Sequence, residues 1–133
     1  MVEALSLAPE DIPNEDQLYY RYHKQYYKKR GEIRASCFRI INNVISTNWS
    51  RYSTPEICQE QAKVPSDNGI IKINVGEVRN IDLLDVQHNP REDNRAHTHI
   101  IGFEICETQA DKNEIRVKLS NISSWVIELN FNF

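Results

Sequence analysis

Two histidines separated by one residue, His97 and His99, stand where a polar loop gives way to an apolar run. Side chains alternate between the two faces of a β-strand, so both imidazoles are expected on one face. His88 precedes the loop, and a hairpin would place it roughly opposite His97. Three imidazoles around an open position suit a catalytic zinc ion, whose bound water ionises near neutral pH. The sequence therefore offers His88, His97 and His99 as candidate metal ligands, with zinc as the metal.

A structural role is the alternative for these histidines, and the sequence favours it. The H-x-H pair lacks a third ligand at a fixed spacing. Neutral imidazoles at the end of a sheet can instead bond to backbone groups and loop carboxylates and so fix a hairpin. Cys106 cannot complete a metal site, because it lies about 30 Å beyond His97 along a strand and faces the other way.

A basic, tyrosine-rich segment is the second place where the sequence points to binding. Seven basic residues and one acidic residue, Glu32, lie between Arg21 and Arg39. Tyr and Arg are enriched at protein interfaces, and the same mixture suits single-stranded nucleic acid, whose bases stack on rings. We expect a protein partner, with nucleic acid bound through residues 19–39 and a solvated surface as the alternatives. The predicted contact residues are Tyr19, Tyr22, Lys24, Tyr26, Tyr27, Lys28, Lys29 and Arg30.

The bulk composition is that of a folded protein with one core. The chain has 133 residues, of which 40% are hydrophobic and 26% charged. Its net charge of −3 gives no global attraction to nucleic acid. The three cysteines are far apart and lack a C-x-x-C pair, so we expect reduced thiols and a cytoplasmic protein. No apolar stretch approaches the roughly 20 residues of a membrane span, and no signal peptide is expected.

The elements expected from the sequence mix helices and strands without regular alternation. Residues 1–14 are expected to form an extended lead-in, and residues 15–133 a single compact α+β domain with a mostly antiparallel sheet and two or three helices. Four segments are candidates for these helices. The first begins at Glu15, and the second begins near Pro55 with Ser53 or Thr54 as its cap. The third is a single turn at "EVRNI", and the fourth is amphipathic, with Ile115, Leu119 and Ile122 on one face. Expected strands cover 43–48, 70–75, "LLDVQHNP", "HTHIIGFEIC" and 125–131.

Several segments together resemble a family of small uncharacterised bacterial proteins. The marks are "VGEVR" at the end of a strand, "H-N-P", and the "N-R-A-H" block that opens the next strand. The resemblance runs from about Leu18 to Trp125 and implies a bacterial origin. It carries no activity, cofactor or catalytic residue. It singles out His97 and leaves His99 outside the recurring pattern, which counts against a metal site.

A second similarity is to the start of ADP-ribosyltransferase-like folds. In those folds an arginine or histidine on an early strand precedes a Ser-Thr strand, and the corresponding residues here are Arg21 or His23 with Ser46–Thr47. Such folds also use a glutamate on a later strand to hold the ribose. Glu104 and Glu128 are the candidates, although neither matches a motif.

Known catalytic motifs are absent from the sequence. It has no nucleophile elbow, P-loop, glycine-rich dinucleotide turn or H-E-x-x-H. We therefore expect a non-enzymatic accessory or adaptor protein of a bacterial multi-component system, such as a defence or toxin-control module, that binds a protein partner. The alternatives are a metal-dependent hydrolase, a degenerate ADP-ribosyltransferase-like protein and a nucleic-acid-binding protein.

Overall fold

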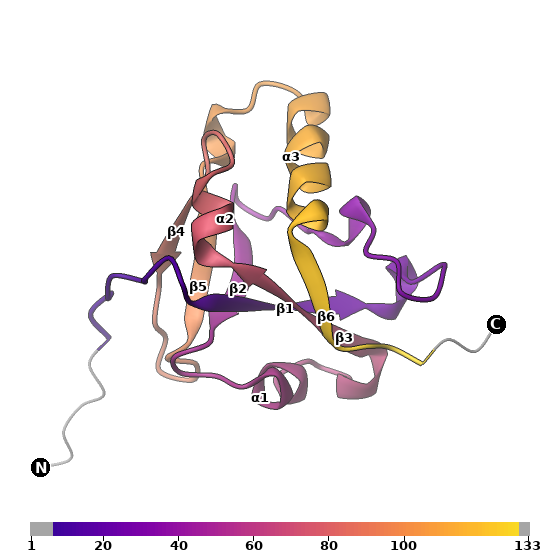
Figure 1. Cartoon of the computed structure of the whole chain (residues 1–133). Helices are drawn as coiled ribbons and strands as arrows, with labels where there is room; N and C mark the ends of the chain where they lie inside the picture. The colour runs from indigo at the N-terminus through magenta and orange to yellow at the C-terminus, as the bar shows by residue number, and fades with distance from the viewer. Residues whose placement is uncertain (1–6, 131–133) are drawn as a thin grey trace, which may run out of the picture.

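Six strands of the described chain form one sheet, and every neighbouring pair runs antiparallel in the order β4-β5-β2-β1-β3-β6. This computed structural model describes residues 7–130 (Figure 1). The strands are β1 (Gln17–His23), β2 (Ile45–Trp49), β3 (Asn68–Asn74), β4 (Asp85–His88), β5 (His97–Ile101) and β6 (Ser123–Ile127). The helices are α1 (Pro55–Glu60), α2 (Val75–Arg79) and α3 (Gln109–Asn121), with 3-10 turns at Lys24–Tyr26, Ala35–Cys37, Pro65–Asp67 and Phe103–Ile105. The expected α+β class is confirmed.

The helix expected from Glu15 is wrong, because this segment forms β1 near the centre of the sheet. Leu18 and Tyr22 are spaced as on a helix, but with Tyr20 between them they also alternate as on a strand. All seven residues of β1 pair with β3, and its other edge pairs with β2. Backbone pairing along both edges, together with three buried side chains, outweighs a weak local preference for helix.

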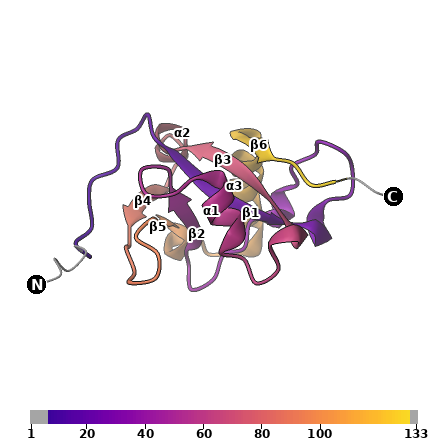
Figure 2. The same ribbon diagram turned by 90° about the horizontal axis from the view of Figure 1, so that it is seen from below.

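The sheet has an apolar face and a polar face. Side chains of the apolar face pack with α2 and α3 into the core, whereas α1 lies on the opposite side of the sheet (Figures 1 and 2). Buried members of the apolar face include Leu18, Tyr20, Tyr22, Ile45, Ile71 and Ile73. Because successive residues of a strand point to opposite faces, Tyr19, Arg21 and His23 are left on the polar side.

The helix start expected after Ser53 or Thr54 is confirmed, whereas α2 begins at Val75, two residues before the turn expected at "EVRNI". The Thr54 hydroxyl accepts a hydrogen bond from the Ile57 N–H at the start of α1. Asn74 and Thr108 cap α2 and α3 in the same way. Within residues 7–130, no helix has both the length and the apolar character needed to span a bilayer.

Several of the expected strands are shorter than the sequence indicated, and the one expected over "LLDVQHNP" is reduced to β4, Asp85–His88. β5 ends at Ile101 because Gly102 adopts a φ of +119°, and Phe103 then starts a 3-10 turn. The expectation that Phe103 and Ile105 continue the strand is therefore wrong. The last strand covers Ser123–Ile127 instead of 125–131, and residue 131 lies outside the described residues.

The described part of the N-terminal lead-in, residues 7–14, has no helix or strand. It is nevertheless attached to the body, since Ile12 is buried in the core. The Asn14 carbonyl also accepts a hydrogen bond from the Gly76 N–H in α2. Residues 1–6 of the expected lead-in lie outside the described chain.

Candidate functional site

Polar side chains from three adjacent strands form two rows on the polar face of the sheet. In the first row, Tyr19 of β1 pairs with Asn48 of β2, which pairs with His97 of β5. In the second row, Ser46 pairs with His99. Cross-strand neighbours have Cβ atoms about 5 Å apart, so each row brings its side chains into reach of one another.

A cavity of about 540 Å³ lies over this face. Its lining includes Tyr19 and Ser46 from the strands, and Cys58 and Gln61 from α1 and its C-terminal end. The β4–β5 loop and the chain between β1 and β2 supply the remaining walls. The site is therefore built from segments that are far apart in the sequence, and this size is typical of a small-molecule pocket, at roughly 300–1,000 Å³.

Three arginines line the cavity from three different segments. Arg21 lies on β1, Arg39 precedes β2 and Arg91 lies in the β4–β5 loop. Among the described residues none of the three forms an ion pair with a carboxylate. Asp93 is the one carboxylate among the lining residues. The cavity is therefore electropositive, although the chain as a whole is acidic.

Asn48 fixes the position of two of the cavity walls. Its amide nitrogen donates to Gln61 Oε1 at 2.8 Å and to Ser53 Oγ at 3.2 Å. Its amide oxygen accepts from Asn94 Nδ2 at 2.8 Å. The side chain is 3% exposed, so these bonds satisfy a buried amide and hold α1 and the β4–β5 loop against β2.

His97 is a buried residue that lines the cavity and has one ring nitrogen bonded within the described chain. Its Nδ1 lies 3.1 Å from the Asn89 carbonyl oxygen, which can only accept, so Nδ1 carries the proton. Nε2 takes no hydrogen bond from another described residue and keeps its lone pair. Burial lowers the pKa of His97, the Asn89 bond acts in the opposite direction, and Arg91 lowers the pKa further. The His97 and His99 rings meet edge to face at 4.7 Å.

The expectation that His88 meets the other two histidines is wrong, because the pairing of β4 with β5 is shifted by one residue from the register expected. His88 pairs with Thr98, so its ring lies on the opposite face of the sheet from His97 and His99. Both ring nitrogens are already bonded: Nδ1 accepts from the Glu10 N–H at 3.0 Å, and Nε2 donates to the Arg95 carbonyl at 2.7 Å. Across residues 7–130 no group of three or more His, Cys, Asp or Glu could hold a metal ion.

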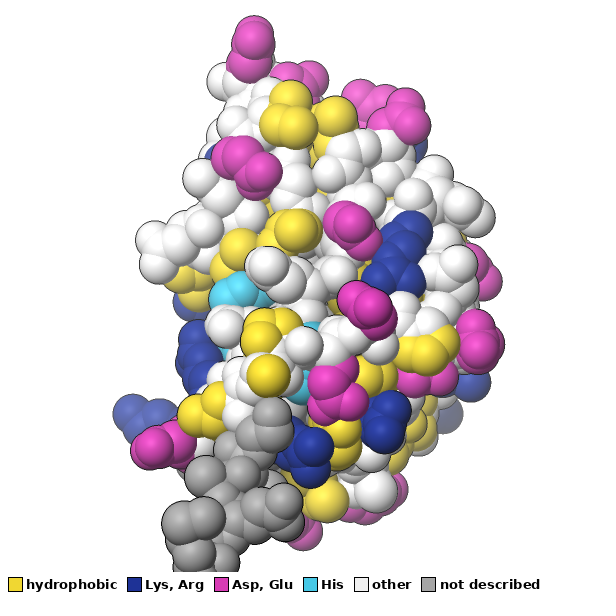
Figure 3. Space-filling model, turned by 90° about the vertical axis from the view of Figure 1, so that its left-hand side faces the viewer, with side chains coloured by type: hydrophobic (Ala, Val, Ile, Leu, Met, Phe, Trp, Pro, Cys, Tyr) yellow, Lys and Arg dark blue, Asp and Glu magenta, His cyan; other side chains and the backbone are white. Residues whose placement is uncertain are grey.

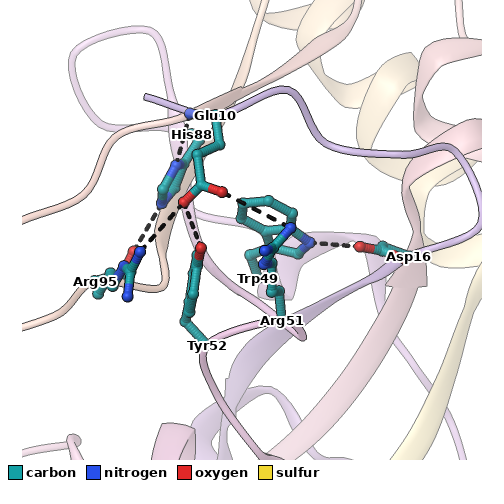
Figure 4. A network of polar contacts seen from close by, with 7 residues as sticks. All are labelled: Glu10, Asp16, Trp49, Arg51, Tyr52, His88 and Arg95. Carbon is teal, nitrogen blue, oxygen red and sulfur yellow. Dashed lines mark hydrogen bonds and ion pairs between the residues drawn. The ribbon is translucent and has the colours of Figure 1, made fainter. Parts of the chain in front are cut away.

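His88 instead belongs to a polar network that attaches the N-terminal segment (Figure 4). Its ring packs against Trp49 and Tyr52. Glu10 accepts a hydrogen bond from the Tyr52 hydroxyl and pairs with Arg95 at 3.7 Å. Seen from the side on which β4 lies, histidine side chains reach the surface only as small patches (Figure 3). The arrangement matches the structural role favoured for this histidine.

The predicted contact residues of the tyrosine-rich segment divide into three groups. Tyr22 and Tyr27 are 0% and 2% exposed, so they belong to the core and cannot form a contact surface. Tyr19 and Tyr26 line the cavity. The third group is basic and exposed, and it lies in the 3-10 turn and loop that follow β1: Lys24, Lys28, Lys29 and Arg30.

The structure brings together some of the residues that correspond to the start of ADP-ribosyltransferase-like folds. Arg21, His23 and Ser46–Thr47 all line the cavity. Neither candidate glutamate does: Glu104 is exposed in the turn after β5, and Glu128 accepts a hydrogen bond from the Tyr27 hydroxyl. Neither glutamate that was a candidate for holding a ribose is therefore placed at the cavity.

Sequence reasoning missed Arg91 and Asn48 as members of the site, and it counted Arg39 only as the end of the basic segment. No local motif marks them, because the fold alone brings their segments together. One signal was present: Tyr19, Arg21 and His23 alternate with buried residues, which is the pattern of a strand with one polar face.

Comparisons of the chain with protein-family models, with curated proteins and with solved structures find no match. The resemblance to small bacterial proteins therefore stays a prediction.

Proposed function

We propose that the protein binds an anionic ligand in the cavity on the polar face of its sheet. The observation that carries the proposal is the convergence of Arg21, Arg39 and Arg91 on one hollow without carboxylate partners. Like charges brought together repel each other, and a bound anion offsets that repulsion. Guanidinium groups also bind phosphate and carboxylate through paired hydrogen bonds, which favours a ligand of this chemistry.

The walls of the cavity support binding more than a chance gathering of surface charge. Asn48 holds α1 and the β4–β5 loop in fixed positions. The backbone of the loop that carries Arg91 is therefore in place before a ligand binds. A site whose walls are already in place loses less entropy when a ligand binds.

Calorimetric titration with inorganic pyrophosphate tests the proposal. We expect saturable binding, with an affinity that falls about tenfold in Arg39→Gln and in Arg91→Gln. Arg34→Gln is the matched control, since it removes the same charge from an exposed residue that does not line the cavity. Absence of binding, or an equal loss of affinity in the control, would contradict the proposal.

A second proposal keeps the expected role as a bacterial accessory or adaptor protein that binds a protein partner. It is supported by Lys28 and Lys29, which are exposed and belong to the segment between β1 and β2. Lys28→Glu with Lys29→Glu should abolish binding of a partner purified from the host and leave pyrophosphate binding intact. A cytoplasmic setting is part of this proposal, consistent with the free thiols of Cys37, Cys58 and Cys106.

A further inference from the structure

Tyr19 offers an aromatic ring inside the arginine-lined cavity. The residue is half-buried and lines the cavity, and its ring has no aromatic partner among the described residues. Tyr26 also lines the cavity, but it meets the Tyr22 ring edge to face at 6.5 Å, and its carbonyl accepts a hydrogen bond from the Tyr22 hydroxyl. Of these two cavity-lining tyrosines, Tyr19 is therefore the one whose ring has no other ring packed against it.

The neighbours of Tyr19 complete a site with two kinds of recognition. Arg21 lies two residues further along the same face of β1, about 7 Å away. Ser46, on the neighbouring strand, has an exposed side chain whose hydroxyl forms no hydrogen bond with the rest of the described chain. His97 lies at the other end of the row formed by Tyr19, Asn48 and His97, and its Nε2 is unprotonated. The cavity thus places a stacking surface, cations and small polar groups side by side.

We propose that the anionic ligand is a nucleoside phosphate, bound with its base against Tyr19 and its phosphate among the arginines. This inference rests on the proposed anion site and adds the class of ligand. The base, sugar and phosphate of a nucleotide supply in sequence the planar, polar and anionic parts that the cavity matches. Stacking on an aromatic ring is the usual way in which proteins hold a single base, whatever its identity.

Other phosphate-bearing ligands match the site less completely. A sugar phosphate or a phosphorylated side chain uses the arginines but leaves the Tyr19 ring unoccupied. The ligand can be a free nucleotide or a nucleotide exposed in a single strand, because both present the same base, sugar and phosphate. The cavity volume of about 540 Å³ accommodates one such unit.

Calorimetric titrations with ribose 5-phosphate and with the four common ribonucleoside 5′-monophosphates test the inference. We expect the nucleotides to bind about tenfold more tightly than ribose 5-phosphate, because only they can stack. Tyr19→Leu should remove this difference without changing the affinity for ribose 5-phosphate, whereas Tyr19→Phe should keep it. Circular dichroism and thermal unfolding verify that both variants are folded.

The outcomes separate this inference from the proposed function. If ribose 5-phosphate and the nucleotides bind equally well, the ligand class is wrong and the anion site stands. If neither they nor pyrophosphate bind, both proposals fall. Tighter binding of a short single-stranded oligonucleotide, lost in Tyr19→Leu, supports the inference with the strand as the source of the nucleotide. Oligonucleotide binding that Tyr19→Leu leaves unchanged contradicts it.

Discussion

At the scale of single residues, the three histidines near the β4–β5 hairpin have different environments. Burial and nearby arginine charge favour the neutral ring at both His97 and His99. His88 lies on the other face, with both nitrogens bonded to backbone groups. The shared residue type therefore says little about shared chemistry, and strand register decides which imidazole faces the cavity.

The lowered pKa values of His97 and His99 predict a dependence of stability on pH. Each ring binds a proton less readily in the folded state, so the unfolded chain takes up more protons below a pH of about 6.5. The free energy of unfolding should therefore decrease as the pH falls from 7 to 5. His97→Gln keeps a donor for the Asn89 carbonyl and should reduce this decrease, and His97→Gln with His99→Gln should reduce it further. Urea denaturation at several pH values measures the free energy of unfolding. A pH dependence that is unchanged in the double variant would contradict the lowered pKa values of the two histidines.

At the scale of elements, local signals predicted those elements that local interactions define. Ser53 or Thr54 before Pro55 marked the start of α1, and the alternation of Ile71 and Ile73 marked β3. β1 was misread because its tyrosines fit two periods, and only the pairing with β3 decides between them. The cavity could not be predicted for the same reason, since Arg39 and Arg91 meet Arg21 only through the tertiary fold.

The end of β5 gives a prediction about two glycines. Gly102 has a φ of +119°, and a Cβ there would lie 1.9 Å from the Leu83 carbonyl oxygen. Gly31 also has a positive φ, +78°, but a Cβ would meet no atom within 4 Å. Gly31→Ala should therefore cost about 1 kcal/mol of stability, from backbone strain alone. Gly102→Ala should cost about 3 kcal/mol or more, because the backbone must also move. Chemical denaturation compares the two, and equal costs would contradict the close approach at Gly102.

At the scale of the whole molecule, the sign of the local charge differs from the sign of the total. The chain carries a net charge of −3, yet the lining of the cavity contains three arginines and one carboxylate. Composition predicted a protein without a general attraction to anions, and it could not predict a hollow in which cations gather. Salt screens both the net negative charge of the molecule and the positive charge of the cavity. The direction in which salt changes the affinity therefore shows which of the two acts on a bound anion.

We expect the affinity for pyrophosphate to fall as sodium chloride is raised from about 20 to 200 mM, because the screening length shortens to below about 10 Å. Removing one cation in Arg39→Gln should make this dependence less steep. The measurement is the dissociation constant over the salt series. An affinity that rises with salt would show that the net negative charge of the molecule dominates and that the arginines do not hold the anion.

The network around Glu10 has a consequence for the order in which the chain acquires its structure during synthesis. Glu10 and His88 are bonded across 78 positions, and Arg95 comes later still. A nascent chain that ends before His88 therefore offers the N-terminal segment only Tyr52 and Arg51 among these partners. Arg91 and Asn94, which close the cavity, are made after the β1–β2–β3 sheet can already form. Asn14 can therefore meet Gly76 of α2 before the β4–β5 hairpin is made, whereas the contacts of Glu10 with His88 and Arg95 and the closure of the cavity all require that hairpin.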